Sequence, residues 1–244
     1  VHFMAETASI VSPDKTVLLP SPEAGCPMAD TITAASLLYR KKEIPGTPVV
    51  TYVNSTAEVK AESDICCTSA NAVAVVKSLN SPQVLMTPDR NLALWTQRHV
   101  SSKILLWDGH CNIHNRLTAQ QVIEAKTRWP EAVVVAHPEC RPEILDIADA
   151  VRSTSGMLDY CSKNQAKQFL IATENGLLHQ LRHQNPDKKF YQVSRNMLCP
   201  NMKMNRLENV LKSLETLTPE VKVPENVRVR AWKAVERMLA IPRD

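Results

Sequence analysis

The sequence predicts an α/β fold of three units related by a pseudo-threefold axis, each a parallel sheet flanked by helices in three αβα layers, with the first unit truncated. Short apolar runs bounded by polar turns alternate with segments of helical periodicity, which is typical of parallel strands joined by helices. The pattern also recurs, because the apolar run from Leu85 is matched 85 residues later by a run from Leu170. Units repeated at this spacing are expected to share interfaces around a common axis.

The second unit shows the expected elements most clearly. We predict strands at the apolar runs 48–53, 65–67, 83–86 and 103–107. A capping box from Ser55 to Glu58 predicts a short helix, and Ser69 is predicted to cap a helix that runs to residue 79. Further helices are predicted at 91–99 and 118–129. The third unit repeats this order from residue 132 onward.

These elements divide the chain into four segments. The remainder of the first unit occupies residues 1–46, the second unit 47–130, the third unit 131–217 and a C-terminal helical tail 218–244. Val1 corresponds to Met86 by the same 85-residue step, so we expect the chain to be a fragment that begins in mid-unit. Pro200 is predicted as a first helical residue. Two apolar stripes are predicted to pack into the core: Leu207, Val210, Leu211 and Leu214, and then Val227, Ala231, Val235 and Met238.

Composition and charge exclude several classes of protein. The net charge of +4 is not gathered into a basic stripe, which argues against a nucleic-acid partner. No apolar run approaches the ~18 residues of a membrane span. With five glycines the chain has neither GxGxxG nor GxxxxGK, so nucleotide binding is disfavoured. Seven cysteines without a signal peptide favour reduced thiols or metal ligation in the cytoplasm.

Three of the cysteines follow the repeat. Cys26, Cys111 and Cys199 lie 85 and 88 residues apart, whereas the other four do not recur. Three thiolates at equivalent corners of three units can hold a [4Fe–4S] cluster and leave its fourth iron open as a Lewis acid. In two cases the next residue is proline, which predicts the cysteine as a helix N-cap. The alternatives are a buried apolar role for each thiol and Cys140 as a rival ligand; zinc is disfavoured because no CxxC pair is present.

Polar residues that end strands or precede helices are candidates for the substrate site. Tyr52, Asn54, His137 and Glu139 end strands, where parallel sheets bind their ligands. Glu139 beside His137 suits general acid/base work, although both could instead serve turns and caps. Helix-preceding hydroxyls can cap a helix or hold a phosphate or carboxylate, and the chain has three such residues: Ser69, Ser153 and Thr154. His110 and His114 flank Cys111 and either orient its loop or are exposed.

Five segments in order strongly resemble the quinolinate synthase family, and the resemblance runs from Val1 to about Met238. They are residues 3–8 (FMAETA), 107–114 (WDGHCNIH), 137–139 (HPE), 153–155 (STS) and 199–205 (CPNMKMN). The resemblance implies an enzyme of de novo NAD synthesis that condenses iminoaspartate with dihydroxyacetone phosphate, losing phosphate and two waters, to give quinolinate. It also implies a functional link to L-aspartate oxidase or aspartate dehydrogenase.

Carried over to this sequence, the resemblance assigns each predicted residue a role. It implies that Cys26, Cys111 and Cys199 hold the [4Fe–4S] cluster and that its fourth iron is open to substrate. The implied substrate-binding residues are Tyr52, Asn54, Ser69, His137, Glu139, Ser153 and Thr154, with Glu139, His137 and Tyr52 also catalytic. Further substrate-binding residues of the family, including a His, a Tyr and a Ser, are expected before Val1, so we expect this chain as written to be inactive without them.

Two other functions remain as alternatives. One is a different [4Fe–4S] hydro-lyase, in which the open iron dehydrates a hydroxy acid. The other is a non-catalytic α/β repeat scaffold with buried cysteines. Iron and sulfide content separates the scaffold from the enzymes, and quinolinate formation separates the two enzymes.

Overall fold

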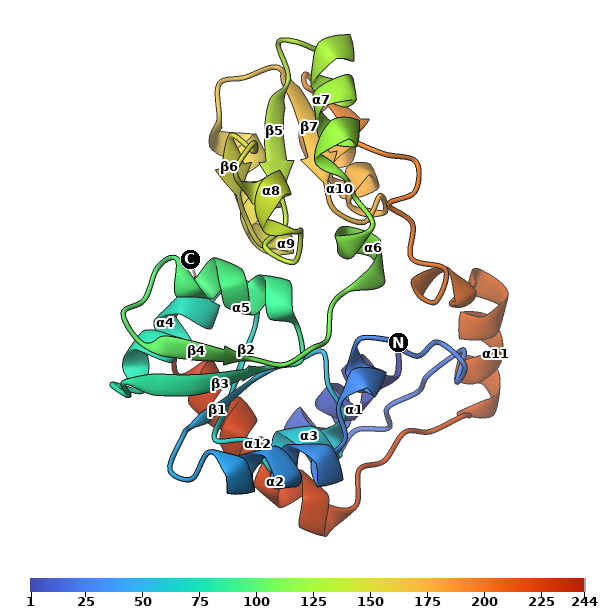
Figure 1. Ribbon diagram of the computed structural model, residues 1–244. Helices are drawn as coiled ribbons and strands as arrows, with labels where there is room; N and C mark the ends of the chain where they lie inside the picture. Colours follow the sequence, from blue (N-terminus) through green and yellow to red (C-terminus); the bar gives the residue numbers. More distant parts are fainter. Residues whose placement is uncertain (244) are drawn as a thin grey trace. The chain divides into compact units, whose positions relative to one another are not determined.

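The computed structural model describes residues 1–243 of the chain, which form two compact lobes (Figure 1). The larger lobe consists of Val1–Gly109 and Pro200–Pro242, and the smaller lobe of His110–Cys199. Each lobe is described by itself. The four segments predicted from the sequence, which divide the chain differently, stay a prediction.

The larger lobe has a four-stranded parallel sheet in the order β2-β1-β3-β4. Its strands are β1 (Val49–Tyr52), β2 (Ile65–Cys67), β3 (Gln83–Thr87) and β4 (Lys103–Leu106). Its α-helices are α1 (His2–Val11), α2 (Ala34–Glu43), α3 (Ala57–Ala61), α4 (Ala72–Ser78), α5 (Arg90–Gln97), α11 (Leu207–Thr216) and α12 (Glu225–Leu239). Figure 1 shows α4 and α5 on one face of the sheet and α2, α3 and α12 on the other.

The smaller lobe repeats this sheet in the order β6-β5-β7-β8, again all parallel. Its strands are β5 (Val133–Ala136), β6 (Ala150–Val151), β7 (Gln168–Ala172) and β8 (Lys189–Gln192). The helices are α6 (Asn112–Asn115), α7 (Ala119–Arg128), α8 (Pro142–Leu145), α9 (Thr154–Lys163) and α10 (Leu177–Gln184). The core includes stacked rings of Phe169 and Phe190, with centroids 5.4 Å apart, and the buried side chains of Met157 and Leu181.

The sequence repeat has a direct structural counterpart. Each strand of the smaller lobe begins 84 to 86 residues after its counterpart in the larger lobe. Asp64 accepts a hydrogen bond of 2.8 Å from the backbone N–H of Val49, and Asp149 accepts the equivalent bond of 2.8 Å from Val134. The predicted α/β class with parallel sheets and flanking helices is therefore confirmed. None of the helices in the described part of the chain has the length and apolarity that a membrane span requires.

Two predicted helix caps lie at other residues. The N-cap of α3 is Thr56, whose hydroxyl accepts from the N–H of Val59, so the capping box predicted from Ser55 is wrong by one residue. The N-cap of α4 is Asn71, whose side chain accepts from Thr68 and closes a turn that contains Ser69. Because the Asn71 side chain bonds back to Thr68 across this turn, the helix begins after Asn71 and not after Ser69.

The two apolar stripes at the C-terminal end differ in outcome. On α12, the side chains of Ala231, Val235 and Met238 are buried as predicted, whereas that of Val227 is only partly buried. On α11 the prediction of a core stripe is wrong, because Leu207, Leu211 and Leu214 are 80%, 56% and 62% exposed. The side of α11 that faces inward carries Ser213, which is buried. Helical periodicity gives the position of a stripe on a helix but does not say which side the rest of the lobe covers.

Candidate active site

The carboxyl ends of the four strands in the smaller lobe meet at one edge of the sheet. His137 and Glu139 follow β5, Ser153 follows β6, and Thr173 follows β7. The N–H of His137 donates to the carbonyl of Ala172 over 3.1 Å, which holds the ends of β5 and β7 together. Parallel sheets place their ligands at this edge, as expected for His137 and Glu139.

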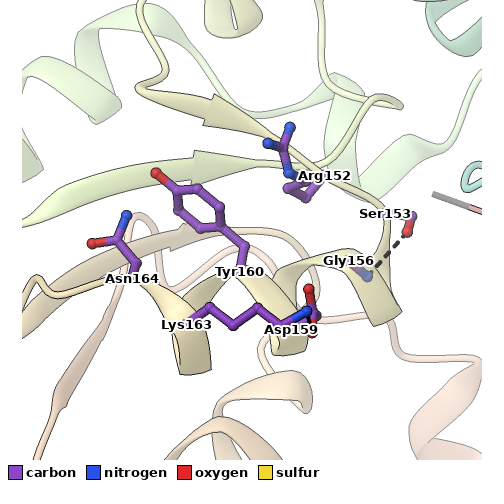
Figure 2. A pocket seen from close by; sticks show the side chains of 7 residues that line it. All are labelled: Arg152, Ser153, Gly156, Asp159, Tyr160, Lys163 and Asn164. Atoms are coloured by element: carbon purple, nitrogen blue, oxygen red, sulfur yellow. Dashed lines mark hydrogen bonds and ion pairs between the residues drawn. The ribbon is translucent and has the colours of Figure 1, made fainter.

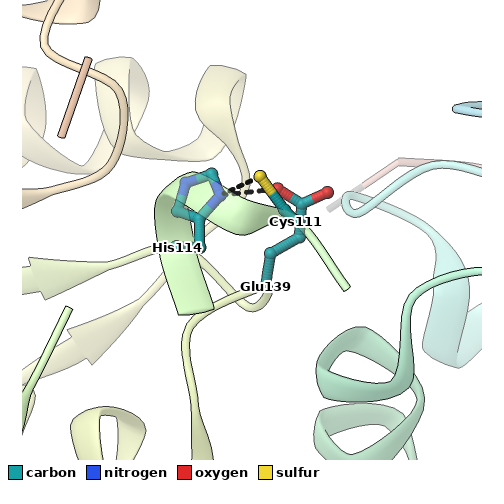
Figure 3. Close-up of side chains that lie close together, drawn as sticks. All are labelled: Cys111, His114 and Glu139. Atoms are coloured by element: carbon teal, nitrogen blue, oxygen red, sulfur yellow. Dashed lines mark hydrogen bonds and ion pairs between the residues drawn. The ribbon is translucent and has the colours of Figure 1, made fainter. Parts of the chain in front are cut away.

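Three side chains of different chemistry lie together at this edge, and we name them the Cys111–His114–Glu139 cluster (Figure 3). Cys111 is the N-cap of α6, and His114 lies one turn further along the same helix. Nδ1 of His114 is 3.2 Å from Cys111 Sγ and 2.8 Å from Glu139 Oε2. The other ring nitrogen, Nε2, is 2.9 Å from the hydroxyl oxygen of Thr173. His114 and Glu139 are only 6% and 4% exposed.

The charges of this cluster depend on one another. Burial alone would lower the pKa of His114, but the charges of Cys111 and Glu139 and the hydrogen bonds to them outweigh it and raise the pKa well above 6.5. His114 is therefore an imidazolium at neutral pH.

His137 has the opposite electrostatic character. Its ring stacks on that of His114 with centroids 4.8 Å apart, and its Nδ1 accepts from the N–H of Glu139 over 3.3 Å. Burial is the largest influence and lowers the pKa of His137 to about 4. His137 is therefore neutral near pH 7, and its Nδ1 also lies 3.4 Å from Glu139 Oε2.

The predicted residues of the larger lobe lie at the equivalent edge of its sheet. Tyr52 is buried at the end of β1, Asn54 follows two residues later, and Ser69 lies in the turn after β2. Beside them, the hydroxyl oxygens of Thr51 and Thr87 are 3.0 Å apart, joining the ends of β1 and β3. Each lobe thus presents its own predicted site residues at the carboxyl edge of a parallel sheet.

Ser153 and Thr154 begin helix α9. Ser153 is the N-cap, and its hydroxyl oxygen accepts from the N–H of Gly156 over 3.1 Å, while Thr154 is exposed. A pocket of about 570 Å³ extends from Ser153 along α9 to Lys163 (Figure 2). Arg152 lies on its wall with the guanidinium 5.2 Å from the centre of the Tyr160 ring. The predicted cap at Ser153 is confirmed, and its hydroxyl oxygen also lies 3.5 Å from that of Ser155.

The three recurring cysteines share a local anchor. The carbonyl oxygen two residues before each cysteine accepts a hydrogen bond from the backbone N–H of a residue at or near the start of a helix. The bonds are His2 to Ala24 (2.9 Å), Arg90 to Gly109 (2.8 Å) and Asn175 to Met197 (2.8 Å). Cys26, Cys111 and Cys199 therefore follow equivalent corners of the chain.

Burial separates these cysteines from the others. Cys26, Cys111 and Cys199 are partly exposed, whereas Cys66, Cys67, Cys140 and Cys161 are buried. Burial raises the pKa of Cys140 to about 11 and those of Cys66 and Cys161 to about 12, and it raises that of Cys67 as well. These four thiols stay protonated at neutral pH.

One prediction about the cysteines is wrong. Cys26 and Cys199 were expected to be N-caps, but the 3₁₀ helices that follow them begin at Ala29 and Met202 and have Met28 and Asn201 as N-caps. The proline after each cysteine starts a helical turn that becomes a regular 3₁₀ helix only two residues later. Cys111, which no proline follows, is the cysteine at an N-cap.

Sequence reasoning did not identify Thr173 and Glu174, and it left His114 with two possible roles. Glu174 follows β7, and its carboxylate accepts from the N–H of Cys199 (3.3 Å) and of Gly176 (2.7 Å). The strand-end position that drew attention to His137 applies equally to Thr173 and Glu174. The three-residue spacing from Cys111 to His114 on a helix was the available signal for their contact.

This fold and site define an α/β enzyme whose polar groups converge at the carboxyl ends of parallel strands. The family model described as Quinolinate synthetase A protein matches residues 1–240. The chain is 55% identical to the quinolinate synthase of Geotalea uraniireducens, covering all of this chain and 80% of that protein. It is 56% identical to that of Pelobacter propionicus, covering 100% and 81%, and 50% identical to that of Thermodesulfovibrio yellowstonii, covering 99% and 80%. The chain belongs to the quinolinate synthetase A family, and the two alternative functions are not favoured.

Proposed function

We propose that the protein is a quinolinate synthase of NAD biosynthesis that condenses iminoaspartate with dihydroxyacetone phosphate at a [4Fe–4S] cluster held by Cys26, Cys111 and Cys199. The observation that carries the proposal is the shared anchor two residues before each cysteine. It makes the three positions equivalent in structure as well as in sequence, while family membership supplies the reaction.

The donor set fits a cluster of this kind. Iron–sulfur clusters take cysteine thiolates, and the three recurring cysteines are partly exposed. The four remaining cysteines are buried and hold their protons, which makes them poor ligands. When bound, the cluster supplies a Lewis-acidic iron next to the polar residues of the site.

The residues around Glu139 are arranged to move protons. The His114 ring holds the Glu139 carboxylate at 2.8 Å, where Glu139 can accept a proton from a substrate carbon or hydroxyl in the dehydrations. Neutral His137 offers its Nε2–H as a donor to the substrate. Thr173 holds the far side of the His114 ring and fixes its orientation. In this arrangement Glu139 serves as the base and the neighbouring His137 as the acid.

The remaining predicted residues bind and orient the substrates. Tyr52 and Asn54 position the condensing intermediate, and Ser69, Ser153 and Thr154 donate hydrogen bonds to its carboxylates or to the phosphate. Iminoaspartate is supplied by L-aspartate oxidase or aspartate dehydrogenase, which gives the enzyme a functional link to one of these. All of these steps take place in the cytoplasm.

The test uses the full-length gene product purified without oxygen. We expect a brown protein with about four iron and four sulfide per chain, and formation of quinolinate from iminoaspartate and dihydroxyacetone phosphate. A colourless protein that stays free of iron after reconstitution would contradict the cluster. A loaded protein that dehydrates a hydroxy acid but makes no quinolinate would contradict the reaction.

A further inference from the structure

The Cys111–His114–Glu139 cluster has a property that the proposed reaction does not use. A thiol, an imidazole and a carboxylate from one lobe converge on a common point, and their donor atoms all lie within 4.8 Å of one another. Four-coordinate zinc holds such donors at about 2.0–2.3 Å, so its ligand atoms are separated by roughly 3.3–3.8 Å. The observed 3.2 Å between Sγ and Nδ1 and 2.8 Å between Nδ1 and Oε2 need small outward shifts to reach these values, and the Cys111 and Glu139 donor atoms, which lie within 4.8 Å of each other, need an inward one.

We propose that, in protein that lacks the iron–sulfur cluster, Cys111, His114 and Glu139 bind one divalent ion of the zinc class, and that this ion blocks cluster assembly. Thiolate, imidazole and carboxylate together select zinc or cobalt over magnesium or calcium, which prefer oxygen donors only. Three protein ligands leave the fourth position open to water, as in catalytic zinc sites.

The surroundings of His114 match those of a metal ligand. A metal-binding histidine usually donates its second ring N–H to a neighbouring acceptor, which fixes its tautomer and orientation. In this site Nδ1 faces the other two donors, and Nε2 lies 2.9 Å from the Thr173 hydroxyl oxygen. The stacked ring of His137 holds the His114 plane from one side. The ligand is therefore already oriented.

Charge balance favours occupation by a divalent cation. As metal ligands, Cys111 and Glu139 would supply two negative charges in a region where His114 and Glu139 are almost fully buried, and the His114 ring would release its Nδ1 proton. A divalent cation neutralises both, and a buried charge is tolerated only when it is paired or coordinates a metal. The neighbouring Cys140 does not compete, because its Sγ faces the Ala172 carbonyl at 3.5 Å and burial keeps it protonated.

The test is a titration of Co²⁺, as a coloured substitute for Zn²⁺, into the full chain after removal of its cluster and reduction of its thiols. We expect one Co²⁺ per chain, a sulfur-to-cobalt charge-transfer band and the intense visible bands of a four-coordinate ion. Cys111→Ser should abolish the charge-transfer band. His114→Gln and Glu139→Gln should weaken binding at least tenfold, and Thr173→Val should weaken it about 10–100-fold.

Matched variants in the same lobe serve as controls. Cys140→Ser, His110→Gln and Glu174→Gln replace the same residue types near the site and should leave cobalt binding unchanged. Persistence of the charge-transfer band in Cys111→Ser, or no binding below millimolar Co²⁺, would overturn the proposal. Circular dichroism of each variant separates loss of a ligand from loss of the fold.

The result of the cobalt titration can be distinguished from the result of the test for the proposed iron–sulfur cluster. Cys26→Ser and Cys199→Ser should lose the iron–sulfur cluster but keep the cobalt site, whereas His114→Gln should do the reverse. Zn²⁺ added before reconstitution should lower the iron content of the unmodified protein but not that of His114→Gln. Equal inhibition of both proteins by Zn²⁺ would show that the ion acts elsewhere and would contradict the blocking role.

Discussion

Glu139 illustrates how a buried carboxyl group is given partners within the fold. A carboxylate that is 4% exposed would be costly to ionise alone, since burial disfavours the charged form. The His114 imidazolium at 2.8 Å offsets this cost, and the backbone of the same residue donates to His137. A carboxyl group with partners of its own is therefore available at the strand edge without exposure to water.

Replacement of Glu139 by glutamine tests its role as acid and base. Glu139→Gln preserves the shape of the side chain but cannot exchange a proton, so we expect full iron and sulfide content with quinolinate formation about 10²–10⁴-fold slower. Iron analysis and a quinolinate assay on the full-length product measure both. Near-normal turnover would show that Glu139 only packs or caps.

Lys60 is a second buried charge, in the larger lobe. Its side chain is fully buried, its ammonium donates to the Ser55 carbonyl, and it lies 6.0 Å from the centre of the Phe3 ring. Burial is the largest influence and lowers the pKa of Lys60 from 10.5 to about 8, against the opposing effects of Cys66 and Glu6. This lysine holds the segment after Asn54 at a cost to stability.

The cost makes stability depend on pH in a defined direction. Below pH 8 both the folded and the unfolded chain carry the Lys60 proton, so the full penalty is present, on the order of 3 kcal/mol. Between pH 8 and 10.5 the folded protein has lost the proton while the unfolded chain keeps it, so the penalty disappears as pH rises.

Lys60→Met should therefore be more stable than the unmodified protein at pH 7 and unfold at a higher urea concentration. Removal of the buried charge is offset by about 1 kcal/mol for the lost hydrogen bond to Ser55, so the free energy of unfolding should rise by about 2 kcal/mol. The advantage should shrink at pH 9.5. Urea unfolding at the two pH values measures it. A difference that is the same at both would show that burial of the charge is not its source.

At the scale of elements, the sequence was a better guide to strands than to helix ends. Apolar runs predicted β1 to β4 to within one residue at each end, and burial of β1, β2 and β3 in a parallel sheet leaves little freedom of composition there. The ends of helices depend on partners that the local sequence pattern does not show. The Ser55 carbonyl is taken by Lys60, and the first N–H of α3 donates to Glu6 from another helix.

One glycine fixes the loop that carries Cys111. A methyl group at Gly109 would lie 2.4 Å from the Pro88 carbonyl oxygen and 2.5 Å from the Thr31 hydroxyl oxygen, too close for either to remain in place. The same residue accepts the anchoring N–H of Arg90. The approach of the two loops therefore depends on the absence of a side chain at this position.

Gly109→Ala should destabilise the protein by about 1–3 kcal/mol and lower its iron content, because the Cys111 loop must move. Gly25→Ala is the matched control, since it also precedes a recurring cysteine but its methyl group would come no closer than 3.9 Å to a neighbour. Thermal unfolding and iron analysis compare the two. Equal iron content in both variants would contradict the role of Gly109.

At the scale of the whole molecule, the repeat predicted which cysteines differ from the rest but not what lies beside them. The 85-residue spacing selected Cys26, Cys111 and Cys199, and the structure gives all three the same anchor. The partners of Cys111 could not be derived in this way. His114, Glu139 and Thr173 come from three segments, and their contacts depend on the packing of α6 over the ends of β5 and β7.

The most direct test of the account is the iron and sulfide content of seven variants, each with one cysteine replaced by serine, in the full-length protein reconstituted without oxygen. We predict that Cys26→Ser, Cys111→Ser and Cys199→Ser lose the cluster. The four variants at the buried positions, Cys66, Cys67, Cys140 and Cys161, should keep about four iron per chain wherever circular dichroism shows an intact fold. Loss of iron in Cys140→Ser together with full iron in Cys111→Ser would contradict the ligand assignment.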